Sequence, residues 1–483
     1  MNGGAEFGFS VHADDDAILH EGYVRRFSVD IAGRIGVTAN VVSSLRSVEE
    51  LCLERAFQGL GGDSYFDCSG GSGSKKQNHN GGQEAKRTTV HDAFSITGAA
   101  AFPVMSSLSA CYSVIEMIRR LIQRRFLLCF IVVSALASAE TRRMVIIDQD
   151  GSGPGGSNQM AMMVLLQSPH AEVLGITMVS GNAWEPEEVQ HTLRMLELIH
   201  RTDVPVVPGA IFPLVRTEEE STLEQKLYGT FSWDGAWGDL RAKTSREPYH
   251  GPYVIPKLAE GSPTLKPLDE DAAHFLVRQV RAHPHEVTIY AAGPLTNIAL
   301  AISIDPHFAE MTQGIVIMGG SLDPQTGDPE FANNPRHEFN FWFDPEAAHI
   351  TLRAHWPRID LTTVDISVKT GFTKAMLEDI AHSSHPAAKY LANYTDEFYY
   401  LWDELAAAAW LDPAIITKEQ KLYVDVDLNR GPFYGDTLSW TAANKPSLDL
   451  QLVHVQTDLD LPRFNKLFVD LMKAPPQPAS MAK

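Results

Sequence analysis

Cysteine is scarce in this chain and confined to its first third. The sequence contains four cysteines, Cys52, Cys68, Cys111 and Cys129, and none between there and residue 483. The later region therefore cannot build a disulfide framework or a zinc site of the zinc-finger type. The alternating strands and helices described below lie wholly in this cysteine-free part.

Basic residues are also few. The chain has 40 Lys and Arg against 60 Asp and Glu, which gives a formal net charge of -20 at pH 7. Such an excess of acid argues against a nucleic-acid backbone or an anionic membrane as partner. The apolar run at 126–139 is too short to cross a bilayer, which needs about 20 residues.

Two phosphate-binding signatures are absent as well. A glycine-rich loop, 151–156, precedes a predicted helix, and loops of this kind can cradle anions. It lacks the lysine of a P-loop and the spacing of a dinucleotide-binding fingerprint. The sequence therefore disfavours a phosphate-binding role for this loop.

The overall composition is that of a globular protein. Of 483 residues, 44% are hydrophobic and 21% are charged, which leaves enough apolar residues for a sizeable core. This length predicts either one large domain with additional sequence or two domains. We expect a single catalytic domain over residues 140–483.

The first 139 residues do not resemble a folded domain. Residues 1–116 show little periodicity and include a low-complexity patch, Ser69–Lys86, so we expect them to be disordered or poorly structured. Residues 117–139 then combine a methionine, four arginines, a short apolar run and small residues at Ala135, Ala137 and Ala139. This pattern predicts a secretory signal peptide.

An internal signal peptide has a consequence for the reading frame. It implies that translation begins at Met117, that residues 1–116 are a non-native upstream extension, and that the mature protein is exported to the periplasm or secreted. After cleavage no membrane association is expected. The alternative, a buried core helix, leaves the four flanking arginines unexplained.

The most informative stretch is Arg142–Leu166. An apolar, β-branched run is followed by Asp148 and Asp150, the glycine-rich loop, and a stretch from Asn158 whose Met and Leu content favours helix. In open α/β sheets, ligands bind beyond the carboxyl ends of the strands. The two aspartates are therefore candidate site residues, although plain loop and capping roles are the alternative.

Strands and helices alternate through the rest of the chain. This alternation predicts an open, mostly parallel sheet with helices on both faces, similar to a Rossmann fold. Residues 211–268 are irregular and contain two tryptophans, Trp233 and Trp237, which favours a lid or substrate wall, although aromatic packing is an alternative. The predicted strands after the first are 173–179, 204–207, 287–291, 314–318, 359–366, 422–426 and 450–455.

Further polar residues occur at positions that suit a binding site. Asn182 follows the predicted strand at 173–179. Glu338 and Asn340 alternate with phenylalanines, which predicts an extended segment with both polar side chains on one side. Trp402 and Asp403 lie in a stretch, 387–410, that is predicted to be one long helix.

Together these motifs resemble the inosine–uridine-preferring nucleoside hydrolase family. The resemblance covers about residues 142–475 and rests on the order and spacing of several short stretches. The matching stretches are Ile146–Asp150, Gly181-Asn182, Gly293–Asn297, Met318–Gly320, Glu338–Asn340 with Asp344–Ala348, and Trp402-Asp403 with Asp412-Pro413.

The resemblance implies a function and a set of site residues. Members of the family split the N-glycosidic bond of nucleosides with water and use one calcium ion. By this resemblance Asp150 is a calcium ligand and the catalytic base, Asp403 is a second catalytic residue and calcium ligand, and the backbone carbonyl of Ala292 is a further ligand. The residues implied to bind substrate are Asn182, Glu338, Asn340, Asn333 or Asn334, Trp402, and His250 on a mobile loop.

Two departures from the family pattern affect the expected chemistry. The first motif normally carries two further aspartates, whereas here Asn158 is the best candidate to replace one of them. Because calcium affinity falls with ligand charge, we expect a weakened or altered calcium site. Trp402 stands where many purine-active members have a histidine that protonates the leaving base, so that proton must come from elsewhere.

The sequence therefore predicts an exported hydrolase that cleaves ribonucleosides to ribose and free base. Two alternatives stay open: a hydrolase of another N-riboside or modified sugar, and a secreted nucleoside- or ribose-binding protein without hydrolytic activity. The expected partner is a small-molecule nucleoside and not a nucleic acid. A homo-oligomer is expected only by analogy with the family.

Overall fold

The computed structural model describes residues 142–238, 250–396 and 398–477. The upstream region 1–116 and the predicted signal peptide 117–139 lie outside the described residues. All described residues belong to one compact unit.

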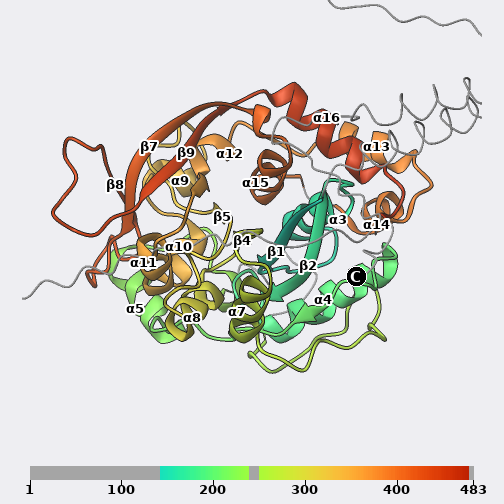
Figure 1. Cartoon of the computed structure of the whole chain (residues 1–483), viewed down its shortest axis with the longest axis horizontal. Helices are drawn as coiled ribbons and strands as arrows, with labels where there is room; N and C mark the ends of the chain where they lie inside the picture. The colour runs from blue at the N-terminus through green and yellow to red at the C-terminus, as the bar shows by residue number, and fades with distance from the viewer. Residues whose placement is uncertain (1–141, 239–249, 397, 478–483) are drawn as a thin grey trace, which may run out of the picture. The chain divides into compact units, whose positions relative to one another are not determined.

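A nine-stranded sheet forms the centre of this unit, in the order β3-β2-β1-β4-β5-β6-β9-β7-β8 (Figure 1). In this order, the first seven strands, β3 through β9, run parallel to one another. The strand β7 is antiparallel to both of its neighbours, β9 and β8. The strands are β1 (Arg143–Gln149), β2 (Ala171–Met178), β3 (Val206–Val207), β4 (Val287–Ala292), β5 (Gly314–Met318), β6 (Ile359–Thr362), β7 (Ile416–Val426), β8 (Thr437–Trp440) and β9 (Leu452–Leu459).

Helices cover both faces of the sheet. The longer ones are α3 (Ser157–Leu166), α4 (Glu185–Leu198), α5 (Glu218–Tyr228), α7 (Ala272–Ala282), α8 (Thr296–Ile304), α11 (Pro345–Arg353), α13 (Lys374–Ala381), α14 (Pro386–Tyr394), α15 (Trp402–Leu411) and α16 (Leu461–Met472). The shorter ones are α9 (Pro329–Asn333), α10 (Phe339–Phe343), α12 (Val364–Ser367), η1 (Gly235–Trp237) and η2 (Pro413–Ile415).

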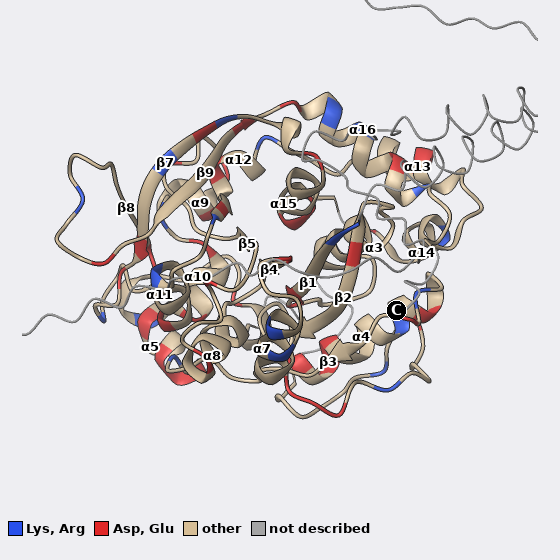
Figure 2. Cartoon of the chain, in the orientation of Figure 1, with Lys and Arg blue, Asp and Glu red and all other residues tan. Residues whose placement is uncertain are grey.

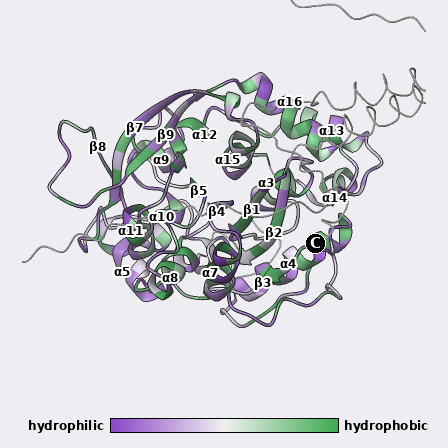
Figure 3. Ribbon diagram, in the orientation of Figure 1, coloured by the Kyte–Doolittle hydropathy of each residue, from purple (hydrophilic) through white to green (hydrophobic). Residues whose placement is uncertain are grey.

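Two apolar cores lie on opposite sides of β1, because successive side chains of a strand point to opposite faces. Val145 and Ile147 pack with α3, α4, α15 and α16, whereas Ile146 packs with α7, α8 and α11. All three side chains are fully buried. The hydrophobic colour along β1 and α3 in Figure 3 marks this central region, and the predicted fold class is confirmed.

The strand order places a topological switch point beside β1. From β1 the chain winds outward through β2 to β3, and from β4 it winds the other way through β5 to β6. In open α/β sheets, ligands bind outside the carboxyl ends of the strands at such a point. The carboxyl ends of β1 and β4 carry Asp150 and Ala292, so the topology puts the predicted site residues where a ligand is expected.

Several local predictions were wrong. The strand at 359–366 ends at Thr362 and gives way to α12, and the long helix at 387–410 is two helices, α14 and α15. Glu338 and Asn340 are not in an extended segment, because Glu338 caps α10 with its own side chain. The irregular region 211–268 contains the helix α5, and β8 was not predicted.

Among the helices that the structure describes, none combines the length and the apolar character of a membrane span.

Candidate functional site

A cavity of about 750 Å³ opens at the carboxyl ends of the central strands. It is bordered by the glycine-rich loop that follows β1, by α9 and α10, and by the start of α15. Figure 2 shows acidic residues at the end of β1 and on α15, near the middle of the unit. The predicted site residues that line the cavity are Asn158, Asn182, Ala292, Glu338, Asn340, Trp402 and Asp403.

Asp150 is buried directly beneath this cavity. Its Oδ1 accepts a hydrogen bond from Asn158 Nδ2 at 2.9 Å, and its Oδ2 accepts one from the Asn182 backbone N–H at 3.0 Å. Two glycines make room for it, since a Cβ on Gly181 would lie 2.2 Å from Asp150 Oδ2 and one on Gly293 would lie 3.0 Å from Asp150 N. The motif glycines therefore allow backbone to pack against this carboxylate.

Asp403 approaches Asp150 from the first turn of α15. Its Oδ2 accepts hydrogen bonds from Gln149 Nε2 at 3.1 Å and from Asn158 Nδ2 at 3.0 Å. Burial raises the pKa of Asp403 to about 7, against the effect of these hydrogen bonds. Burial also raises the pKa of Asp150 well above its usual range, and the nearby Asp403 charge raises it further. A cation between the two would relieve this repulsion.

Asn158 occupies the centre of this group. Its Nδ2 lies 3.1 Å from Gln149 Oε1, in addition to its contacts with Asp150 and Asp403. Three oxygens thus surround one amide group, and a half-turn of that amide would put its own oxygen among them, since the two orientations have almost the same shape.

This donor set fits a calcium-type ion. Carboxylate, amide and carbonyl oxygens are the ligands that calcium takes, and Asp150, Asp403 and Asn158 bring three such groups together. Ala292 pairs with Gln149 across the β1–β4 ladder and lines the same cavity, so its carbonyl belongs to the same edge. The set carries two carboxylates, Asp150 and Asp403.

Glu338 and Asn340 lie on the other side of the cavity. Glu338 is held by three backbone N–H groups: Oε1 accepts from Asn340 at 2.9 Å, and Oε2 accepts from Gly320 at 2.9 Å and Phe341 at 3.0 Å. Burial raises the pKa of Glu338, and these hydrogen bonds oppose the rise. The Asn340 amide donates to the Met318 carbonyl at the end of β5, at 3.1 Å.

Asn182 is oriented by a residue from the predicted lid region. Trp233 Nε1 donates to Asn182 Oδ1 at 2.7 Å, and Asn182 Nδ2 donates to Asn158 Oδ1 at 3.3 Å. Trp233 also lines the cavity. Its predicted role as a substrate wall is consistent with this position, and its hydrogen bond could not be foreseen from the sequence.

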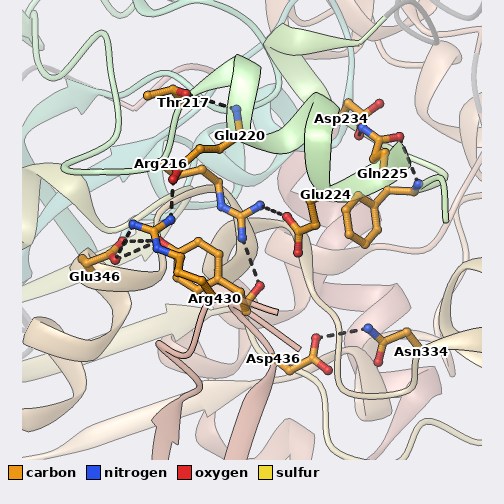
Figure 4. Close-up of polar contacts among 12 residues, drawn as sticks. Arg216, Thr217, Glu220, Glu224, Gln225, Asp234, Asn334, Glu346, Arg430 and Asp436 are labelled. Carbon is orange, nitrogen blue, oxygen red and sulfur yellow. Dashed lines mark hydrogen bonds and ion pairs between the residues drawn. The ribbon is translucent and has the colours of Figure 1, made fainter. Parts of the chain in front are cut away.

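The segment before Trp233 is anchored by a buried arginine. Arg216 donates to Glu224 Oε2 at 2.6 Å and to the Tyr434 carbonyl at 3.0 Å, and its guanidinium lies over the Trp342 ring. Figure 4 shows Arg216 next to Glu224 of α5, and the hydrogen bond to the Tyr434 carbonyl connects this pair to the segment before β8. The contacts of Arg216 therefore hold the segment that leads to Trp233 in the cavity wall.

Three predicted substrate-binding residues do not line the cavity. His250 Nε2 lies 3.1 Å from Glu187 Oε2, and its backbone carbonyl accepts from Trp184 Nε1. Asn333 is exposed at the end of α9, and Asn334 Nδ2 donates to Asp436 Oδ1 at 3.1 Å.

Two polar residues next to Asp150 were missed or left without a definite role. Gln149 contacts both Asn158 and Asp403, although the only sequence signal was its position between two aspartates. Asp148 points away from the cavity and accepts hydrogen bonds from Thr177 at 2.5 Å and Asn297 at 2.8 Å. Burial raises the pKa of Asp148 to about 7, and its hydrogen bonds connect the end of β1 to β2 and α8.

A larger cavity, of about 1100 Å³, lies at the opposite ends of the strands. It borders a carboxylate–imidazole group formed by Asp360, Glu419 and His454. Arg358 Nη2 lies 2.7 Å from Asp360 and 3.4 Å from Glu419, so a guanidinium already balances these carboxylates. Neither feature contains a predicted site residue.

Comparison with known proteins agrees with the geometry. Residues 145–466 match the family described as inosine-uridine preferring nucleoside hydrolase. The chain is 29% identical to the probable uridine nucleosidase 2 of Arabidopsis thaliana, over 68% of this chain and 97% of that protein. It is 28% identical to the pyrimidine-specific ribonucleoside hydrolase RihA of Salmonella arizonae, over 68% of this chain and 98% of that protein.

Solved structures agree as well. A plant nucleoside hydrolase, PpNRh1, superposes with a TM-score of 0.53 at 26% identity and covers 69% of this chain and 99% of its own. A purine-preferring ribonucleoside hydrolase from Gardnerella vaginalis, at 23% identity and a TM-score of 0.54, shares the fold over 68% of this chain and 98% of its own. The chain belongs to the inosine-uridine preferring nucleoside hydrolase family, and its activity is hydrolysis of the N-glycosidic bond of ribonucleosides.

Proposed function

We propose that the cavity binds a ribonucleoside with its ribose against Asn182, Glu338 and Asn340, and that Asp150 activates the attacking water. The observation that carries this proposal is the convergence of Asp150, Asp403 and Asn158 at the switch point of the sheet. This arrangement puts a pair of buried carboxylates next to the proposed sugar site.

The chemistry follows from the charges in the cavity. As the bond from C1′ to the base breaks, the sugar gains oxocarbenium character, which the carboxylates stabilise more than they stabilise the ground state. Asp150 takes a proton from the water that attacks C1′. The N–H groups that hold Glu338 keep its carboxylate aimed in one direction, which suits a contact with the ribose hydroxyls.

The same proposal includes a calcium ion held by Asp150, Asp403, Asn158 Oδ1 and the Ala292 carbonyl. Bound calcium would lower the pKa of the attacking water and keep both aspartates ionised. Because Asn158 brings no charge, we expect weaker binding than a site with a third carboxylate would give. Calcium titration by isothermal calorimetry tests this, and no heat at millimolar calcium would contradict it.

The decisive experiment measures base release by the full chain from uridine, cytidine, inosine and guanosine, with calcium and with a chelator. We expect calcium-dependent release that Asp150→Ala abolishes. The matched control is Asp360→Asn, which removes a carboxylate at the opposite ends of the strands and should keep the activity. Ribose-dependent thermal stabilisation without base release would instead favour the binding-protein alternative.

We also propose that the protein is exported, with translation from Met117 and signal cleavage after Ala137 or Ala139. The support is the sequence pattern of residues 117–139. Expression of the full reading frame, followed by N-terminal sequencing of the protein outside the cytoplasm, tests this. An intact Met1 terminus on a protein retained in the cytoplasm would contradict it.

A further inference from the structure

Nucleoside hydrolysis needs a second proton transfer besides the one to Asp150. The nucleobase leaves with the electron pair of the C1′–N bond, and a proton delivered to it lowers the barrier. The acid must face the cavity, carry a proton near neutral pH and have no other partner. Trp402 cannot serve, because the indole N–H donates hydrogen bonds but does not transfer its proton.

Most ionisable groups in the cavity are already engaged. Asp403 and Glu338 are held by the hydrogen bonds described above, and His191 is paired with Glu187 and Glu260. Asp328 caps α9 by accepting from the Glu330 backbone N–H at 3.1 Å. Tyr394, Asp396, Tyr399 and Tyr400 also line the cavity. The rings of Tyr394 and Tyr400 pack against Tyr390 and Trp402, and both Asp396 and Tyr399 have partners.

Glu330 meets the conditions. It is partly buried on α9 and lines the cavity, and none of the described residues donates a hydrogen bond to its carboxyl group. The next residue, Phe331, packs edge-on against Trp402 with ring centroids 5.6 Å apart. This contact fixes α9 next to the start of α15, which also carries Asp403.

We infer that Glu330 is the general acid that protonates the departing nucleobase. This inference rests on the proposed function of the cavity. Burial, together with the charges of Asp328 and Glu338, raises the pKa of Glu330 to about 7. No cation among the described residues pairs with the Glu330 carboxyl group. This group therefore keeps its proton near neutral pH, where an ordinary glutamate is ionised.

The proposed step balances as follows. The C1′–N bond breaks and its electron pair moves onto the base, while the Glu330 proton moves to a nitrogen or carbonyl oxygen of that base. The water oxygen bonds to C1′ and its proton moves to Asp150. After release, Glu330 regains a proton from solvent and Asp150 loses one, so the net reaction is nucleoside plus water to ribose plus base.

The test compares two leaving groups in the full chain carrying Glu330→Gln. Glutamine keeps a hydrogen-bond donor but cannot transfer a proton. We expect kcat for the best natural ribonucleoside to fall by about 10²–10⁴-fold, as loss of a general acid does. With p-nitrophenyl β-D-ribofuranoside, whose leaving group departs as a stable anion, kcat should change by less than about threefold.

The pH profile gives a second readout. In the unmodified chain, kcat for the natural substrate should fall as pH rises past about 7, and this alkaline limb should vanish in Glu330→Gln. Asp328→Asn should move the limb to lower pH, because it removes a charge that raises the Glu330 pKa while asparagine still caps the helix. The matched control, Glu378→Gln on the exposed face of α13, should change neither property.

Each outcome separates the two proposals. Equal loss on both substrates, or no loss on the natural one, would overturn the role of Glu330 and leave the proposed function intact. If the unmodified chain cleaved neither substrate with calcium present, the proposed function would fail and the inference with it.

Discussion

At the scale of single residues, Asn158 decides the charge of the candidate metal site. It sits between two buried carboxylates and supplies an amide where the family pattern implies an aspartate. As a hydrogen-bond donor it stabilises Asp150 and Asp403 without a cation, and as an oxygen ligand it can join them around one. Asn158 therefore allows the site to fold both with and without a bound cation.

Asn158→Asp should increase the affinity for calcium and decrease the stability of the calcium-free protein. We expect calcium to bind at least about tenfold more tightly, because ligand charge sets calcium affinity. Without calcium the variant should lose about 3–5 kcal/mol of stability, since it adds an unpaired buried charge next to two others. Calorimetric titration and urea unfolding with and without a chelator measure both effects, and unchanged calcium affinity would exclude Asn158 from the site.

The pKa values of these residues also predict how stability changes with pH. Burial raises the folded-state pKa of Asp403 and Asp148 to about 7, whereas both titrate near pH 3.9 in an unfolded chain. The folded state thus binds more protons between these values, and stability falls as pH rises through that window. In a chelator, the melting temperature should be higher at pH 5.5 than at pH 7.5.

Calcium should reverse this trend, because it binds the ionised carboxylates. Asp403→Asn in the chelator should flatten the pH dependence relative to the unmodified chain. A chelated protein that melted at a higher temperature at pH 7.5 would show that the aspartates are not kept protonated by burial.

Two of the residues that the sequence identified directly follow buried strands. Asp150 and Asn182 stand directly after apolar runs, so their place at the sheet edge could be predicted. Glu330 could not, because its role depends on how α9 packs against Trp402, which leaves no periodic signal. Asn333 and Asn334 were chosen by resemblance, and the turn after α9 directs them away from the cavity.

At the scale of elements, α5 depends on one buried cation. Arg216 is fully buried between Glu224, the Tyr434 carbonyl and the face of Trp342. Burial lowers the pKa of Arg216, and the Glu224 charge opposes that shift. The helix and the cavity wall that follows it are therefore held by an interaction that cannot be removed without exposing a buried charge.

Arg216→Met should destabilise the protein by about 3–5 kcal/mol, because Glu224 is left without its partner. The matched control is Arg430→Met, which removes a 46% exposed side chain paired with Glu220 and Glu346 and should cost less than about 1 kcal/mol. Urea unfolding measures both. Similar losses for the two variants would mean that burial does not set the strength of these pairs.

The errors in predicting elements have physical causes. The stretch 387–410 is rich in alanine, leucine and aromatic residues, which favours one helix, but the segment between α14 and α15 turns to place Tyr400 against the Trp402 ring. Glu338 is an unusual helix cap, so its alternation with phenylalanines favoured an extended segment. Central strands were found reliably because continuous β-branched runs leave little ambiguity. In contrast, α5 buries only Ser221, so its sequence has no apolar periodicity that would predict a helix.

At the scale of the whole molecule, the order of strands determines where the candidate site lies. The switch point beside β1 depends on chain topology and not on any one side chain. The alternation of strands and helices is enough to predict it, and the fold was predicted correctly for this reason. The loops around the cavity could not be predicted, because their conformations depend on contacts between distant segments.

The contact of Asp403 with Gln149 and Asn158 affects when the candidate site can form during protein synthesis. Gln149 and Asn158 meet Asp403 across 254 and 245 residues of chain, so the two parts of the candidate site emerge from the ribosome far apart in time. A nascent chain that ends before α15 has the strand carboxylate but lacks its partner. We therefore expect chains that terminate before α15 to have no nucleoside-cleaving capacity, even if their first strands have paired.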